Sequence, residues 1–77
     1  MALRHFLIVY DLRESRRVLL EEFASARRAT DAYAAAEEEY RDRSADFEVV
    51  LVGADSLETV KVTHSRYFDD ERDPMPF

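Results

Sequence analysis

The chain has 77 residues, with 17 acidic against 11 basic residues, a formal net charge of −6 and no cysteine. This length predicts one small domain, and the lack of cysteine excludes disulfides and thiolate metal sites in this sequence. The acidic balance argues against nucleic-acid binding, and the 47% hydrophobic content is that of a globular chain.

No stretch approaches the ~20 apolar residues that a membrane-spanning helix needs. The apolar run from Phe6 to Tyr10 is too short for the core of a secretory signal. We therefore expect a cytoplasmic protein with no membrane contact.

Residues Leu3 to Leu12 form an almost continuous apolar run, which predicts a strand that is buried on both faces and is therefore central. A short polar break at residues 13–16 separates it from a second predicted strand at 17–23, and so short a gap favours an antiparallel hairpin. The alternative is a helix from Glu14 through Tyr40, because Leu, Glu and Arg are good helix formers.

A helix is predicted after Ser25, which is placed to cap its N-terminus. The helix is expected to end near Ser44, with ion pairs between Glu37 and Arg41 and between Glu39 and Arg43. Small and aromatic residues recur on one face at three- and four-residue spacing: Ala26, Ala29, Tyr33, Ala36 and Tyr40.

The third predicted strand, 47–52, ends at Gly53, the only glycine of the chain. Asp55 and Glu58 have the spacing of a capping box and predict the start of a second helix. The inner face of that helix is predicted from five residues: Leu57, Val60, His64, Tyr67 and Phe68. Residues 1–68 thus form one domain, and residues 69–77 form an acidic tail with two prolines.

The element order ββαβα predicts an α+β fold. We expect a three-stranded antiparallel sheet in the order 2-1-3, with two helices on one face. Val49 and Leu51 are expected beneath the first helix, with Tyr33 and Tyr40 packed on the sheet.

Two helices on one face would leave the other face of the sheet uncovered, although both faces are apolar. Such a patch predicts an interface. The candidate interface residues are Leu7, Val9, Val50 and Val52. We expect a homodimer or a complex with another protein, the alternative being that the tail folds across the open face.

No catalytic, cofactor-binding or metal-binding residue is predicted, and we do not expect an enzyme. The sequence has neither a glycine-rich phosphate loop nor a cysteine nucleophile. His5 and His64 are expected to be structural, and the acidic run 37–39 is spread around its helix. In the tail, Met75 and Phe77 are candidates for a linear docking motif.

Arginine outnumbers lysine ten to one, Lys61 being the only lysine, a bias common in proteins of GC-rich genomes. The segments RHFLIVYD, FEVVLVGADSLET and THSRYF resemble those of small uncharacterised proteins of GC-rich actinobacteria or their phages. The resemblance covers most of residues 4–68 and implies no activity.

The sequence therefore predicts a small non-catalytic interaction or regulatory domain that acts through self-association or a protein partner. One alternative is an acidic inhibitor that mimics nucleic acid by presenting Asp31, Glu38 and Asp42 on one face. Another is a small ligand-binding domain or enzyme whose pocket is lined by Tyr10, His64 and Tyr67.

Overall fold

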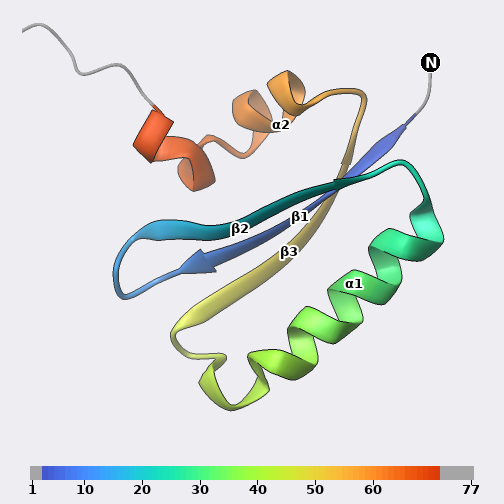
Figure 1. Ribbon diagram of the computed structural model, residues 1–77. Coiled ribbons are helices and arrows are strands. Elements are labelled where there is room, and N and C mark those ends of the chain that lie inside the picture. Colours follow the sequence, from blue (N-terminus) through green and yellow to red (C-terminus); the bar gives the residue numbers. More distant parts are fainter. Residues whose placement is uncertain (1–2, 72–77) are drawn as a thin grey trace, which may run out of the picture.

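A computed structural model describes residues 3–71, in which a three-stranded antiparallel sheet lies between two helical layers (Figure 1). The strand order β2-β1-β3 confirms the predicted sheet and the α+β class, and the second segment is a strand rather than part of a long helix. The elements are β1 (Arg4–Asp11), β2 (Arg16–Phe23), α1 (Ala26–Glu39), the 3₁₀ turn η1 (Arg41–Arg43), β3 (Phe47–Ala54), α2 (Leu57–Thr63) and the 3₁₀ segment η2 (Ser65–Glu71).

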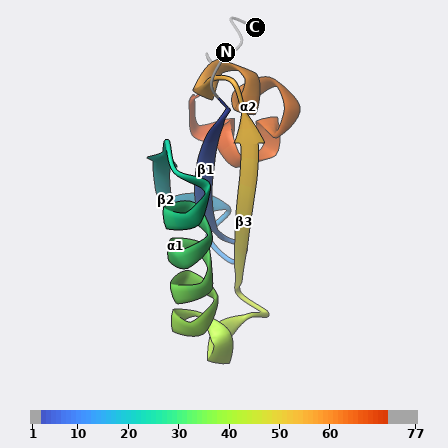
Figure 2. The ribbon, with the colours of Figure 1, turned by 90° about the vertical axis from the view of Figure 1, so that its right-hand side faces the viewer.

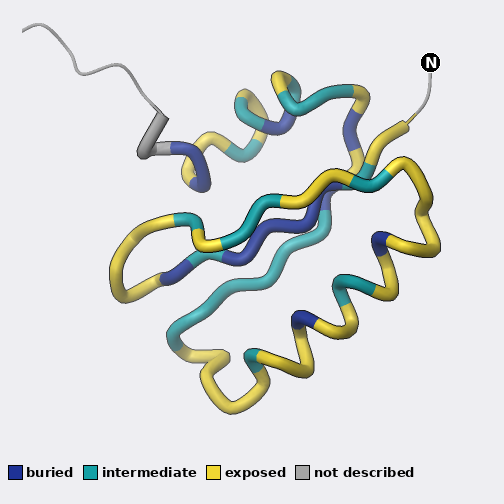
Figure 3. Tube along the Cα trace, in the orientation of Figure 1, coloured by how far each residue is buried: buried dark blue, intermediate teal, exposed yellow. Residues whose placement is uncertain are grey.

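The central strand β1 is the most deeply buried segment of the fold (Figure 3). Phe6 and Leu7 are each 1% exposed, and Ile8 and Val9 are each 0% exposed. Successive side chains of a strand point to opposite faces. A run of four buried apolar residues therefore requires cover on both sides of the sheet.

The β1–β2 hairpin turns without glycine. Ser15 takes a left-handed conformation, with φ 55°, which costs a residue with a Cβ more than it costs glycine. The Asp11 carboxylate supports the turn, since its Oδ1 accepts from the Arg13 and Glu14 amides at 3.0 Å each. A bulge between Val9 and Tyr10 shifts the register with β2.

The register of β1 with β3 decides which residues share a face. Leu7 lies opposite Leu51, and Ile8 lies opposite Val50. Because directly opposed residues of an antiparallel pair are on the same face, the two strands supply two separate apolar sets. One set is Leu7, Val9, Val49 and Leu51, and the other is Phe6, Ile8, Val50 and Val52.

Helix α1 covers the first set. Its Ala36 is buried against Leu7 and Val9, with Tyr33 and Tyr40 packed alongside. This contact confirms that Val49 and Leu51 lie beneath the first helix. Ser25 caps the helix as predicted, its hydroxyl accepting from the Arg28 amide at 3.2 Å.

The second helical layer, formed by α2 and η2, covers the second set from the opposite side (Figure 2). Val60, Tyr67 and Phe68 are buried against Phe6 and Ile8. The prediction that both helices share one face is therefore wrong. Both faces of β1 are apolar, and one helical layer on each face removes both from water.

Two local predictions also differ from the structure. Ser56, rather than Asp55, is the N-cap of α2, and its hydroxyl accepts from the Thr59 amide at 3.3 Å. Helix α1 ends at Glu39 and continues as the 3₁₀ turn η1. Because 3₁₀ geometry brings residues three apart together, Arg41 pairs with Glu38 instead of Glu37.

Candidate protein interface

The predicted interface residues do not form one patch. Leu7 and Val9 lie beneath α1, whereas Val50 and Val52 face α2 and η2. Three of the four are buried within the chain, Val50 being partly buried. The prediction of an open apolar sheet face is wrong, because α1 covers one face and α2 with η2 covers the other. The register, in which Leu7 lies opposite Leu51, puts Leu7 and Val50 on different faces.

With both faces covered, the outer strands leave two sheet edges. Within residues 3–71, β3 pairs only with β1, and no backbone hydrogen bond is made along its other side. An unpaired edge presents a row of backbone donors and acceptors that a further strand can extend.

The edge formed by β2 carries features that discourage such pairing. Four of its eight residues are charged: Arg16, Arg17, Glu21 and Glu22. Glu22 pairs with Arg4 on the neighbouring strand at 2.9 Å, and a bulge interrupts the register with β1. Charges and bulges are the usual means by which natural sheets protect an edge.

The edge formed by β3 lacks these features. Its eight residues pair with β1 in an unbroken register. Only Glu48 is charged, and this carboxylate forms an ion pair with Arg66. Val49, Val50 and Leu51 are partly exposed in the middle of the strand. The β3 edge is therefore long, regular and apolar, as expected of a strand that pairs with another chain.

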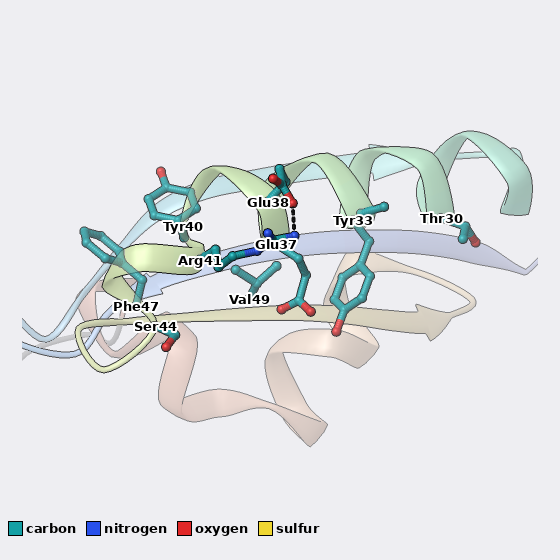
Figure 4. Close-up of a pocket in the computed structure, with 10 residues that line it drawn as sticks. Thr30, Tyr33, Glu37, Glu38, Tyr40, Arg41, Ser44, Phe47 and Val49 are labelled. Carbon is teal, nitrogen blue, oxygen red and sulfur yellow. Dashed lines mark hydrogen bonds and ion pairs between the residues drawn. The ribbon is translucent and has the colours of Figure 1, made fainter.

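A groove of about 590 Å³ runs along the α1 side of this edge (Figure 4). Phe47 and Val49 form its β3 wall, while Tyr33, Ala34 and Glu37 belong to its α1 wall. Within the described residues, the Glu37 carboxylate has no hydrogen bond or ion pair, and it lies beside Val49 in the groove. The Tyr33 and Glu37 side chains reach from α1 to the level of β3 (Figure 4).

The charges along α1 run against the helix dipole. Arg27 and Arg28 stand in its first turn, and the acidic residues 37–39 stand in its last turn. The N-terminus of a helix favours negative charge and the C-terminus favours positive charge. Glu38 pairs with Arg41, and none of the other four side chains has an ion pair within residues 3–68.

Two groups have shifted pKa values, and neither of them lines the groove beside β3. Burial raises the pKa of Tyr67 above its ordinary value of 10.0, and the nearby Glu48 raises it further. The hydroxyl of Thr59 donates to the Asp55 carboxylate and lowers the pKa of Asp55 below its ordinary value of 3.8. Both shifts accompany contacts that hold α2 and η2 in place.

The residues of the alternative pocket serve packing. Tyr10 and Tyr67 meet edge to face, with ring centroids 5.4 Å apart, in the hydrophobic layer beneath α2 and η2. His64 ends α2, where its amide donates to the Val60 carbonyl at 2.8 Å. Among residues 3–68, no group of three or more histidine, aspartate or glutamate side chains is placed to hold a metal ion.

The candidate tail residues Met75 and Phe77 lie outside the described residues. Within the part of the chain that the structure describes, no helix is both long enough and apolar enough to span a membrane. Comparisons with protein-family models, curated proteins and solved structures found no match.

The sequence prediction missed the outer edge of β3. A usable signal was present, since β2 and β3 are equally long but differ fourfold in charged residues. That contrast distinguishes a protected edge from an unprotected one. The contrast was not used, because the interface was predicted on a face of the sheet rather than on its edge.

Proposed function

We propose that this chain is a non-catalytic association domain that pairs, through β3, with an extended strand of another polypeptide. The observation that carries this proposal is the unprotected outer edge of β3 beside the strongly protected edge of β2. The same proposal places the association in the cytoplasm, the compartment expected from the sequence.

Strand addition suits this edge for two reasons. Backbone hydrogen bonds to an added strand provide affinity, while side-chain contacts on either side of the sheet provide specificity. Val49 and Leu51 flank the edge on the α1 side, and Val50 flanks it on the other side. An added strand would remove these partly exposed side chains from water.

A peptide with the β3 sequence tests the edge directly. Isotope-labelled protein is kept dilute and titrated with an excess of a synthetic Phe47–Ala54 peptide, made soluble by lysines at both ends. The peptide is expected to shift the backbone amide resonances of β3 in a saturable manner and to leave those along the β2 edge unchanged.

A matched control peptide carries N-methyl groups at the positions of Val49 and Val50. Adjacent residues of a strand direct their amides to opposite edges, so the two methyl groups block both edges of the peptide. The control is expected not to bind. Equal binding of both peptides, or no response of β3 to the unmodified peptide, contradicts the proposed function.

A further inference from the structure

We infer that the strand added to β3 belongs to a second copy of this chain, and that the α1 helices of the two copies then lie antiparallel beside each other. The inference rests on the proposed function and names its partner. It follows from the symmetry of the sheet, the sequence of β3 and the charges of α1.

The symmetry places both copies of α1 on the same side of the joined sheet. Two identical strands that pair in antiparallel fashion are related by a two-fold axis perpendicular to the sheet, and this rotation preserves the faces. Because α1 covers one face and α2 with η2 the other, each layer meets its own counterpart across the axis. The grooves between α1 and β3 then face each other.

The β3 sequence is compatible with pairing to itself. A register centred on Val50 puts Val49 opposite the partner's Leu51, and Glu48 opposite the partner's Val52. Opposed side chains stay on the same face in this register, and the two Glu48 carboxylates are not opposite each other. Like charges directly across an antiparallel pair would be destabilising.

The contact between Tyr40 and Phe47, whose ring centroids are 4.7 Å apart, shows which residues of α1 lie alongside Val50 of β3. Val50 lies three residues along β3 from Phe47, or about 10 Å at the rise of a strand. The same distance along an α-helix is about seven residues, which leads back from Tyr40 to Tyr33 and Ala34. Ala34 lines the groove, and its small side chain allows a close approach of two helices there.

The reversed charge of α1 finds an explanation in this arrangement. Antiparallel helices bring the acidic last turn of each copy, 37–39, toward the basic first turn of the other, which holds Arg27 and Arg28. An order of charges that is unfavourable to one helix dipole thus becomes complementary between two copies. This charge pattern is why the observations favour a second copy over an unrelated partner.

Charge reversal tests the helix contact, with the dimer dissociation constant measured by light scattering over a dilution series. The double variant that carries Arg27→Glu and Arg28→Glu is expected to weaken self-association about tenfold. The double variant that carries Glu37→Arg and Glu38→Arg is expected to weaken it by the same factor. All four replacements together are expected to restore it to within about threefold.

The double variant Glu37→Arg, Glu38→Arg distinguishes ion pairing between the two helices from repulsion between two negatively charged chains. Its two glutamate-to-arginine changes move the net charge from −6 to −2, since each change adds two positive charges. If only the overall charge mattered, this variant would associate more tightly than the natural chain. If the double variant Glu37→Arg, Glu38→Arg self-associates more strongly than the natural chain, the inferred helix contact is therefore wrong.

Single-cysteine cross-linking checks the placement of α1, because the natural chain has no cysteine. Ala34→Cys is expected to give a covalent dimer with a thiol-specific reagent that spans about 10 Å, roughly one helix diameter. Ala35→Cys is the matched control, since Ala35 is also exposed but stands ~100° further around the helix. Equal cross-linking of the two variants contradicts the inference.

The results also separate this inference from the proposed function. If the chain stays monomeric at every concentration while the β3 peptide still binds, the second copy is the wrong partner and the edge remains an interaction site. If the chain dimerises without cross-linking at Ala34 and without sensitivity to the charge reversals, the inferred α1 contact is wrong.

Discussion

The Tyr40 ring lies against the Phe47 ring, with centroids 4.7 Å apart and planes inclined by 39°. Tyr40 follows the last residue of α1, and Phe47 is the first residue of β3. The Arg43 guanidinium lies over both rings, 5.2 Å and 5.0 Å from their centroids. This cluster ties the helix to the sheet edge and sets the end of the groove between them.

The first prediction concerns this cluster. Phe47→Ala removes the aromatic contact and the surface that the ring covers, and is expected to lower the free energy of unfolding by about 2 kcal/mol. Phe47→Leu retains most of the apolar volume and is expected to lose less. Urea denaturation measures both variants, and equal losses would show that the contact between the rings adds nothing.

The second prediction concerns the two-sided core. Leu7→Ala beneath α1 and Ile8→Ala beneath α2 and η2 are each expected to lower the free energy of unfolding by about 2–5 kcal/mol, because both sites are buried. Val62, which is 79% exposed, provides a control. Val62→Ala is expected to change the free energy of unfolding by less than about 0.5 kcal/mol. If one of the two core variants is as stable as this control, the corresponding face lacks its helical layer.

Features that depend on single segments of this fold can be predicted from the sequence, whereas the alignment of the segments with one another cannot. The apolar run in β1 predicts a central strand, because residues on both of its faces need cover. The order β2-β1-β3 follows once the hairpin and the return through α1 are recognised. These features depend on patterns within single segments, and the structure confirms them.

The register between strands and the side of the sheet that α2 covers could not be predicted in the same way. Alternation assigns residues of one strand to two faces, but where both faces are apolar it leaves the register between strands open. Leu7 and Val50 were predicted on the same face, whereas the observed pairing of Leu7 with Leu51 puts them on opposite faces. The same ambiguity let α2 be assigned to the side that α1 covers.

The third prediction concerns alkaline pH. The pKa of Tyr67 is raised in the folded state above its ordinary value of 10.0, so the unfolded chain loses this proton first. The contribution of neutral Tyr67 to stability is therefore fully present below pH 10 and declines as pH rises through the folded pKa. Unfolding free energies measured from pH 8 to 11 should fall less steeply in Tyr67→Phe; an identical slope would mean that Tyr67 does not cause the loss.

The fourth prediction concerns the start of α2. Ser56→Ala removes the hydroxyl that accepts from the Thr59 amide and is expected to cost about 1 kcal/mol of stability. Asp55→Ala is expected to cost less, because Asp55 is bound to the Thr59 hydroxyl rather than to a backbone amide of the helix. Thermal melting of the two variants compares them. A larger loss for Asp55→Ala would restore Asp55 as the N-cap.

Hydrogen exchange of the β3 amides at low and high protein concentration tests most directly whether β3 pairs with a second copy. Amides that face the outer edge of β3 alternate along the strand and have no partner within residues 3–71. Their exchange is expected to slow as concentration rises, in step with an increase in mass from 9.0 kDa toward twice that value, while amides along the β2 edge are unaffected. Exchange of the outer β3 amides that stays equally fast at every concentration would contradict pairing between copies.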